Sequence, residues 1–329
     1  MENTSLHFPP LGEFDFIKKV LACDVPMDGV SPRERFWFGA GDDCAAFDGW
    51  LVTKDMSAEN SHFRLDWSSP EEAVEKCIVS NVSDISSMGG VPKIALLGIC
   101  VNRNWENSVR ERVAKAFADG FRKRGISLVG GDIVSSDEGL FSVTMFGRAD
   151  GKPLRRSGAR LGDTVYVSGP LGASGAGLWA FLHGKNADPD LSVAVAEHLS
   201  PKIDERFGAK LLRAGVRGGC IDLSDGLSSE LNHLALSSGV KIRIDESKIP
   251  VHPVVSLLSQ KYGIDSREFW LKGGEDYRLL FTSDLPKVIF SENKIPVYPV
   301  GEVLEGSGVE MRNLSGETEI IQASCWSHL

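Results

Sequence analysis

The chain has 329 residues, of which 42% are apolar and 25% are charged, a balance typical of a folded protein with a full hydrophobic core. Its 36 Lys and Arg against 45 Asp and Glu give a formal net charge of −9. This acidic balance excludes the basic nucleic-acid binders and the proteins that adhere to anionic lipid through a basic surface. Because a domain holds about 150 residues, the length predicts two domains.

Cysteine usage and hydropathy both indicate a cytoplasmic protein. The six cysteines are scattered and form no C-x-x-C pair, as expected in a reducing compartment. The longest apolar run, residues 94–101, is far shorter than the ~20 residues of a membrane-spanning helix. The opening residues, MENTSLHFPP, lack the basic and apolar regions of a signal peptide. We therefore expect neither a membrane nor a nucleic acid as partner.

The first half of the chain alternates helical and extended patterns. Pro70-Glu71-Glu72 favours a helix start, because proline fits the first helical turn and acidic residues stabilise its positive end. We expect this helix to run through Met88 and to end at Gly89-Gly90. The other predicted elements are helices over 12–22 and 108–125 and strands over 50–55, 93–101, 126–132 and 140–149.

A break in composition at Asp150-Gly151-Lys152-Pro153 starts a second cycle of strands and helices. It divides the chain into an N-terminal domain, residues 1–152, and a C-terminal domain, residues 153–329. The alternation predicts an α/β fold with mixed sheets. The elements predicted after the break are strands over 164–169 and 240–245, a strand leading into a turn over 220–226, a helix over 227–239, and strand-rich segments over 268–282 and 297–303.

The chemistry is indicated by acidic residues that follow extended segments and lie beside glycine or another small residue. Carboxylate oxygens suit hard cations such as Mg²⁺, and glycine lets backbone amides approach phosphate oxygens. Because several carboxylates would repel an anionic substrate unless metal ions intervene, the pattern predicts a polyphosphate–metal site. The segments are Gly39-Ala40-Gly41-Asp42-Asp43, Thr53-Lys54-Asp55, Asn81-Val82-Ser83-Asp84, Gly130-Gly131-Asp132, Asp222-Leu223-Ser224-Asp225 and Gly273-Gly274-Glu275-Asp276.

A turn-only interpretation stays open for each of these segments, since Asp and Gly are the commonest turn residues. Asp42 and Asp276 in particular are candidates for helix caps or turn formers. The glycine-rich segment 169–177 follows a predicted strand and precedes a helix. It either cradles phosphate at the helix start or makes a tight turn with close packing.

Three further sites each have two interpretations. His62 is either a structural hydrogen-bonding residue or a ligand contact. The pair Arg155-Arg156 is either a solvated surface feature or the source of one phosphate contact. Trp326 either anchors the tail by packing or stacks on a flat heteroaromatic ligand.

Taken together, the motifs resemble a known family. GDD at 41–43, NVSD at 81–84, GGD at 130–132 and IDLSDGL at 221–227 are similar to motifs of the ATP-dependent synthases related to aminoimidazole ribonucleotide synthetase. HFRLDWSSPEE, RRSGARLGD, GGEDY and the tryptophan in the tail are more particular to one branch, and from about residue 12 onward the chain resembles the thiamine-monophosphate kinase family. The resemblance implies a two-domain fold and a homodimer whose N-terminal sheets pair into a β-barrel, with ATP near that interface.

The resemblance also implies roles for individual residues. Lys54 stands where the family usually has threonine, so either its main-chain carbonyl is the only ligand atom needed there or one metal site is altered. The implied Mg²⁺ ligands are Asp43, Thr53, Lys54, Asp55, Asp84, Asp132, Asp222 and Asp225. The implied nucleotide contacts are Gly131, Asp132, Arg156 and Ser224, and the implied contacts to thiamine monophosphate are His62, Glu275 and Trp326.

The implied reaction transfers the γ-phosphoryl group of ATP to the phosphate of thiamine monophosphate, giving thiamine diphosphate and ADP. Clustered Mg²⁺ would neutralise the repulsion between the two anions and align them in line. Because the accepting phosphate oxygen is already ionised at neutral pH, we expect no catalytic side chain. Two alternatives stay open: a related ATP-dependent ring-closing synthase, and a non-catalytic scaffold that binds nucleotide or thiamine phosphate.

Overall fold

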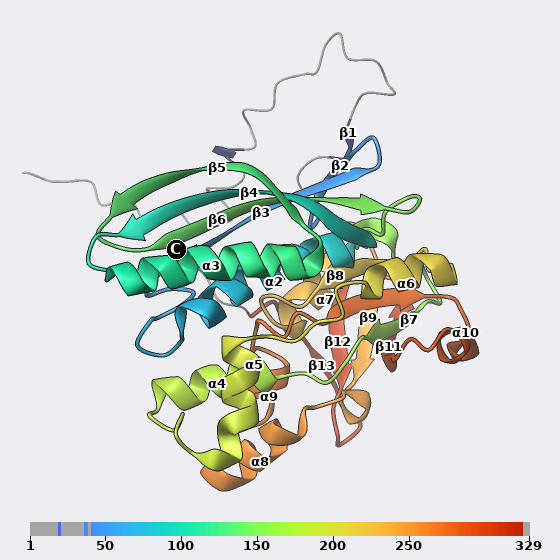
Figure 1. The fold of residues 1–329 in the computed structure, drawn as a ribbon. Helices are drawn as coiled ribbons and strands as arrows, with labels where there is room; N and C mark the ends of the chain where they lie inside the picture. Colours follow the sequence, from blue (N-terminus) through green and yellow to red (C-terminus); the bar gives the residue numbers. More distant parts are fainter. Residues whose placement is uncertain (1–18, 21–35, 39–40, 325–329) are drawn as a thin grey trace, which may run out of the picture.

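The computed structural model describes residues 19–20, 36–38 and 41–324. These residues form two halves, each built around one mixed β-sheet (Figure 1). Of the helix predicted over 12–22, only Lys19 and Val20 fall within the described residues, and both are helical. No helix in these ranges combines the length and the apolar character needed to cross a bilayer.

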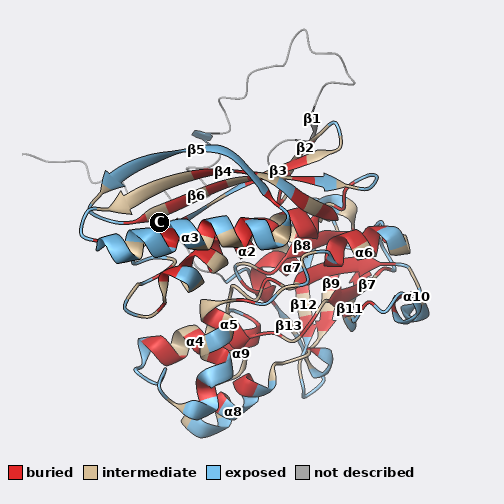
Figure 2. Cartoon of the chain, in the orientation of Figure 1, coloured by how far each residue is buried: buried red, intermediate tan, exposed pale blue. Residues whose placement is uncertain are grey.

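The first half contains a six-stranded sheet in the order β1-β2-β3-β6-β4-β5. β4 and β5 run parallel, and the other neighbouring strands are antiparallel. Helices α2 (Pro70–Ser87) and α3 (Asn107–Arg124) pack beneath the arched sheet in Figure 1, and Figure 2 shows β5 exposed along its length. The strands are β1 (Phe36–Phe38), β2 (Ala45–Phe47), β3 (Trp50–Ala58), β4 (Gly90–Asn102), β5 (Ser127–Ser136) and β6 (Leu140–Ala149).

Helix α2 begins and ends where its sequence predicts. The Ser69 side chain accepts the N–H of Glu72 while the Glu72 carboxylate accepts the N–H of Ser69, so two orphan donors are satisfied reciprocally. Pro70 takes the first helical position. At the other end Met88 is the C-cap, and Gly89 has a φ of +78°, a conformation that favours glycine. The predicted helix is therefore confirmed, and it carries Asp84 in its last turn.

Aromatic side chains fill the core between this sheet and its helices. Phe141 from β6 stacks on Phe63 with 4.9 Å between the ring centroids. The edge of Phe117, from α3, meets the same ring at 5.2 Å. All three side chains are buried, and such aromatic contacts hold α3 against the sheet.

The second half contains a seven-stranded sheet in the order β13-β12-β9-β11-β7-β10-β8, in which β12 and β9 run parallel. The strands are β7 (Thr164–Val167), β8 (Cys220–Asp222), β9 (Lys241–Asp245), β10 (Leu279–Ser283), β11 (Tyr298–Leu304), β12 (Gly308–Arg312) and β13 (Thr318–Ile320). The helices are α4 (Ala173–Leu182), α5 (Ser192–Leu199), α6 (Phe207–Ala214), α7 (Leu227–Ser238), α8 (Pro253–Tyr262), α9 (Arg267–Trp270) and α10 (Lys287–Glu292), with short 3₁₀ turns at Arg156–Gly158, Pro189–Leu191 and Glu246–Lys248.

The extended structure predicted over 268–282 is wrong in its first part, where the chain forms α9 and then an irregular segment before β10. Glu275 and Tyr277 have φ values of +63° and +48°, which an extended strand excludes. The N–H of Glu275 donates to the carbonyl of Ser224 at 2.7 Å. The N–H of Tyr277 donates to the carbonyl of Leu223 at 2.9 Å. Tertiary hydrogen bonds to the turn after β8 therefore fix this segment.

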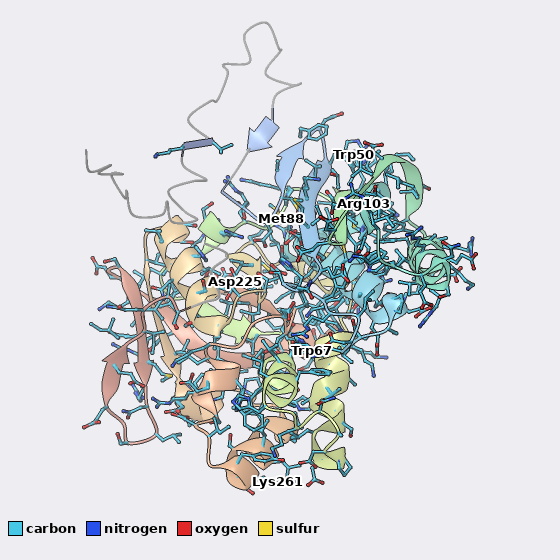
Figure 3. The ribbon with its side chains drawn as sticks, turned by 90° about the vertical axis from the view of Figure 1, so that its left-hand side faces the viewer. Trp50, Trp67, Met88, Arg103, Asp225 and Lys261 are labelled. Atoms are coloured by element: carbon cyan, nitrogen blue, oxygen red, sulfur yellow. The ribbon has the colours of Figure 1, made fainter. Side chains whose placement is uncertain are left out.

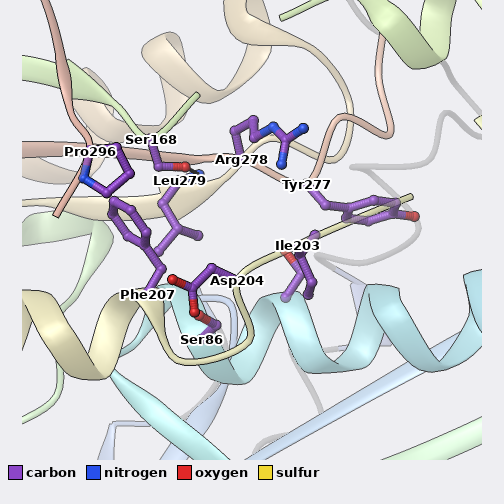
Figure 4. Close-up of a pocket in the computed structure, with 10 residues that line it drawn as sticks. Ser86, Ser168, Ile203, Asp204, Phe207, Tyr277, Arg278, Leu279 and Pro296 are labelled. Carbon is purple, nitrogen blue, oxygen red and sulfur yellow. Dashed lines mark hydrogen bonds between the residues drawn. The ribbon is translucent and has the colours of Figure 1, made fainter. Parts of the chain in front are cut away.

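Helix α2 also packs against the second half, where it contacts α5, α6 and β8. At α6 the N–H of Gly208 lies 3.4 Å from the Ser86 hydroxyl, and a Cβ at residue 208 would collide with the Ser86 carbonyl oxygen. A cavity of about 200 Å³ beside this contact is lined by residues of both halves, among them Ser86, Phe207 and Arg278 (Figure 4). The absence of a side chain at Gly208 thus lets the two halves approach closely.

Gly208→Ala should lower the free energy of unfolding by about 1–3 kcal/mol, because the added methyl group pushes α6 away from α2. Urea denaturation measures this change. Arg213→Ala, at an exposed position of the same helix, should change the stability by less than about 0.5 kcal/mol. Wild-type stability in Gly208→Ala would contradict the close contact.

Candidate active site between the two halves

A pocket of about 970 Å³ opens between the two halves. Figure 3 shows two of its lining residues, Asp225 and Trp67, in the middle of the molecule and Lys261 well away at its lower edge. Most of the residues with expected site roles line this pocket. They are Asp43, Thr53, Lys54, Asp55, His62, Asp84, Arg156, Asp222, Ser224, Asp225 and Glu275.

Four carboxylates from different elements interact in this pocket. Asp43 precedes β2, Asp55 lies on β3, Asp84 on α2, and Asp222 ends β8. Burial, together with the charges of the other three, raises the pKa of Asp84 well above its usual range. Burial and the charge of Asp43 also raise the pKa of Asp222. Buried oxygen ligands that repel one another suit a hard cation.

Three of these four carboxylates accept hydrogen bonds from side chains of the protein. Thr53 donates its hydroxyl to Asp84 at 2.5 Å, and Ser83 donates to Asp222 at 2.5 Å. One oxygen of Asp43 accepts two hydrogen bonds from the Arg156 guanidinium, at 2.6 and 2.8 Å, and the other accepts the Ser87 hydroxyl. Both Asp43 oxygens are therefore engaged.

The carboxylate oxygens of the pocket are therefore not arranged around a common point where a metal ion could bind. Within residues 41–324, no group of three or more His, Cys, Asp or Glu side chains is arranged so that it could hold a metal ion. The chemistry of the donors fits Mg²⁺, since all are oxygens and several are carboxylates whose charge is unbalanced. A bound cation would require these side chains to turn toward one another.

Two expected ligands point elsewhere. The Lys54 side chain donates to Ser142 on β6 at 2.5 Å, and since an ammonium group cannot ligate a cation, any ligand atom of Lys54 is its main-chain carbonyl. Gly131 and Asp132 lie on exposed β5 and do not line the pocket. Across the sheet, Asp132 lies in the same row as Met56 of β3, with β4 and β6 between them. Because neighbouring strands are about 4.8 Å apart, Asp132 lies on the order of 14 Å from β3. Trp326 lies outside the described residues.

The cap interpretation holds for Asp42 and Asp276. The carboxylate of Asp276 accepts the N–H groups of Gly172 and Ser174 at 2.6 and 3.3 Å, at the start of α4. Burial raises the pKa of Asp276 to about 6. The structure favours the tight-turn interpretation of segment 169–177, because the Asp276 carboxylate occupies the N–H groups of Gly172 and Ser174 at this helix end. Asp42 similarly accepts the N–H of Arg156 at 2.9 Å.

A second polar group lies around Glu275. Lys76 on α2 donates to the Glu275 Oε2 at 2.7 Å, and the Nδ1 of His198 lies 3.5 Å from the same oxygen. Although burial opposes it, the charge of Lys76 and its hydrogen bond lower the pKa of Glu275. Burial, with Lys76, lowers the pKa of His198 to about 4. His62 lines the pocket beside them and accepts the N–H of Ala58 through Nδ1 at 3.2 Å.

Sequence reasoning missed Lys76 and His198. A signal for Lys76 was present in its position on α2, eight residues before Asp84. Residues spaced by four, seven or eight positions share one face of a helix. A lysine on the face that carries a predicted ligand was therefore a candidate for the same pocket. No comparable signal marked His198.

Aromatic and apolar side chains form another wall of the pocket. The Trp67 ring stacks on Phe181 with 4.9 Å between centroids, and the Arg64 guanidinium lies 4.5 Å over the Trp67 ring. Trp179 and Leu182, from α4, line the same pocket. The pocket thus joins an acidic region to an apolar, aromatic one, which suits a ligand with both a phosphate and a ring.

The family model described as AIR synthase related protein matches this chain with its N-terminal domain at residues 41–149 and its C-terminal domain at residues 160–312. The first match covers β2 to β6 of the first sheet, and the second covers β7 to β12 of the second sheet. Fold and pocket therefore define a two-domain AIR synthase related protein.

Curated relatives narrow this class. The chain is 34% identical over 319 residues to the thiamine-monophosphate kinase of Methanopyrus kandleri, covering 94% of this chain and 96% of the relative. It is 36% identical over 303 residues to the thiamine-monophosphate kinase of Aquifex aeolicus, covering 91% and 94%. The chain belongs to the thiamine-monophosphate kinase family.

Solved structures agree with this assignment. The structure of AaThiL complexed with AMPPCP and TMP superposes with a TM-score of 0.83 at 33% identity, covering 99% of this chain and all of that one. Thiamine monophosphate kinase from Aquifex aeolicus gives a TM-score of 0.76 at 32% identity, covering 93% and 97%. The hydrogenase maturation protein HypE, at 20% identity and a TM-score of 0.68, shares the fold.

In the metal-free protein, stability should fall as pH rises through the neutral range. The raised pKa of Asp222 makes the folded state bind more protons than the unfolded state, in which the group has its ordinary pKa of 3.8. Asp222→Asn should flatten this dependence, by up to roughly 1.4 kcal/mol per pH unit. Urea unfolding in EDTA from about pH 5 to 7 measures the slope.

Asp137→Asn is the matched control, since the Asp137 side chain is 89% exposed, and it should keep the wild-type slope. If the unfolding free energy of Asp222→Asn changes with pH as steeply as that of the wild type, the pKa of Asp222 is not raised in the folded protein.

Proposed function

We propose that the protein transfers the γ-phosphoryl group of ATP to the phosphate of thiamine monophosphate, giving thiamine diphosphate and ADP. One observation carries the proposal: a single pocket joins the buried carboxylates to the Lys76–Glu275 pair and the aromatic wall. The shared name of its relatives supports it, as does the AMPPCP and TMP bound in the similar structure.

The pocket lets two phosphorylated anions meet without a general base. The accepting phosphate oxygen is already ionised at neutral pH, so positioning and charge neutralisation account for the rate. No side chain has to remove a proton from the acceptor. The chain's own task is to bind the two anions in line and to exclude water from between them.

For Mg²⁺ we propose oxygen ligands contributed by both halves. When bound, Mg²⁺ supplies neutralisation of the charge shared between donor and acceptor phosphates. Arg156 must release Asp43 for that carboxylate to become a ligand, and its guanidinium then becomes available to the phosphates of ATP. The proposed ligands are Asp43, Thr53, the carbonyl of Lys54, Asp55, Asp84, Asp222 and Asp225.

Asp132 and Gly131 can join a nucleotide site only if a second copy covers β5. That strand presents Leu128, Val129, Ile133 and Val134, with exposed fractions of 49–71%, more apolar surface than a monomer usually leaves on one strand. We propose that two copies pair through this sheet into the expected β-barrel, so that the ATP site lies near the interface between the copies.

On the acceptor side we propose that His62, Glu275 and Trp326 contact thiamine monophosphate. His62 and Glu275 line the pocket, and so does Ser324, the last described residue. Glu275 offers a negative charge to the cationic thiazolium ring. An indole at residue 326 would add a cation–π attraction of about 1–2 kcal/mol.

Two further expectations stay predictions. We propose domain limits at 1–152 and 153–329, which fall between the family-model matches that end at 149 and begin at 160. A cytoplasmic location rests on the scattered cysteines, of which Cys44, Cys77, Cys100 and Cys220 are free.

Purified protein should convert thiamine monophosphate and ATP to thiamine diphosphate and ADP in the presence of Mg²⁺, and EDTA should abolish the conversion. Asp84→Asn should lower kcat/KM by about 100-fold or more, since it removes one anionic ligand. Asp137→Asn, at an exposed position, should retain wild-type activity. A coupled assay of ADP release, with product identified by chromatography, measures these effects.

No product with both substrates and millimolar Mg²⁺ would defeat the proposal. Turnover of formylglycinamidine ribonucleotide in its place would identify the ring-closing synthase. Tight binding of both substrates without turnover would identify a scaffold.

Ile133→Asp should convert the proposed dimer to monomers, because it places a charge in the centre of the apolar face of β5. Light scattering after size-exclusion chromatography measures the mass. Leu236→Asp, on α7 and 82% exposed, should leave the mass of the dimer unchanged. A monomeric wild-type protein, or a dimeric Ile133→Asp variant, would contradict pairing through β5.

A further inference from the structure

Lys76 is a buried lysine with an unusual set of partners. Its side chain is 9% exposed, yet it lies on α2 in the wall of the pocket. Its ammonium donates to the Glu275 carboxylate at 2.7 Å and lies 3.5 Å from the carbonyl oxygen of His62. One cation therefore contacts both described residues proposed to bind the acceptor, one from each half of the molecule.

The protein fixes Glu275 in place from the other side. Its φ of +63° lies in the left-handed region, a strained conformation for a residue with a side chain. The Glu275 N–H donates to the carbonyl of Ser224 at 2.7 Å, and a Cβ on neighbouring Gly274 would collide with that carbonyl. Asn60 and Tyr277 of the same pocket also have positive φ values, and such backbone strain clusters at functional sites.

Lys76 is the charge partner of this carboxylate. In the described part of the chain, the hydrogen bond and ion pairs of the Glu275 side chain all use Oε2. His198 also lies at Oε2, but it is neutral near pH 7, since burial lowers its pKa to about 4. The Glu275 side chain remains 28% exposed, which leaves Oε1 available to a ligand in the pocket.

We propose that Lys76 is a positioning residue for acceptor recognition: its ammonium holds Glu275 ionised and oriented so that Oε1 faces the cationic ring of the acceptor, and it fixes the His62 loop beside it. This inference rests on the proposed function and deepens it, since nothing in the carboxylate cluster requires Lys76. Removing the ammonium leaves a carboxylate in a poorly solvated place, where it binds a proton or turns away.

The test compares Lys76→Met, which keeps most of the apolar stem, with Glu275→Gln and the double variant. Each is measured by calorimetric binding of thiamine monophosphate and by steady-state kinetics for both substrates. Lys76→Met should raise the Kd and the KM for thiamine monophosphate about tenfold or more, while the KM for ATP stays within about twofold. The double variant should bind thiamine monophosphate no more weakly than the single variant with the lower affinity, because the two residues act as one unit.

Lys261→Met is the matched control. Lys261 makes ion pairs at the same distance, 2.7 Å, to Asp188 and Asp190, but its side chain is 37% exposed and it does not line the pocket, lying at the lower edge of the molecule in Figure 3. Because Lys261, among the described residues, meets the aromatic wall of the pocket only through Tyr262, this variant should leave the ratio of the two KM values unchanged. Lys76→Arg, which keeps the charge, should recover part of the lost affinity for thiamine monophosphate.

Three results would overturn the inference: an unchanged affinity for thiamine monophosphate in Lys76→Met, an equal rise of both KM values with loss of thermal stability, or additive effects in the double variant. If Lys76→Met does not fold, Glu275→Gln is the deciding variant. An unchanged affinity for thiamine monophosphate in Glu275→Gln would show that Glu275 does not bind the acceptor, and Lys76 would then have no binding residue to position. Absence of turnover in the wild type would defeat the proposed function, whereas binding of thiamine monophosphate to the same protein would still test Lys76.

Discussion

Repulsion among buried carboxylates is the constraint on which the pocket depends. Two like charges at about 4 Å repel by roughly 4 kcal/mol near a protein surface, and here burial adds to the cost of keeping Asp84 and Asp222 ionised. The protein limits that cost with Thr53, Ser83 and Arg156, each of which donates to one carboxylate. A divalent cation would offset it more fully, and the same cation would let two phosphates meet.

Helix α2 connects this constraint to the rest of the fold. Its buried face packs on the first sheet and against α5, α6 and β8 of the second half. Along its length it carries Lys76, which contacts Glu275, and Asp84, which lies among the other carboxylates of the pocket. The close contact at Gly208 keeps the second half near this helix. A displacement of α2 would therefore disturb the carboxylates and the Lys76–Glu275 pair together.

The sequence predicted those features of the structure that depend on neighbouring residues, such as the ends of helices. Pro70 and the glycines after Met88 marked the limits of α2. Acidic residues beside small residues marked Asp55, Asp84 and Asp222, but the expectation that each follows an extended segment is correct only for Asp222, since Asp55 lies within β3 and Asp84 on α2. The place of Asp132 could not be predicted, because it depends on the strand order β3-β6-β4-β5, which no single segment encodes. The prediction of extended structure over 268–282 was wrong in its first part, because tertiary hydrogen bonds hold Glu275 in a left-handed conformation that strand propensity does not indicate. The role of Lys76 depends on a partner 199 residues away in the chain.

The central claim is that carboxylates from both halves hold divalent cations between the two phosphorylated substrates. Anomalous scattering from crystals grown with Mn²⁺, a non-hydrolysable ATP analogue and thiamine monophosphate tests it most directly. The account predicts manganese peaks within coordination distance of Asp84 and of Asp222, with nucleotide phosphates on the same ions. Manganese bound to the nucleotide alone, with both carboxylates still turned to Thr53 and Ser83, would contradict it.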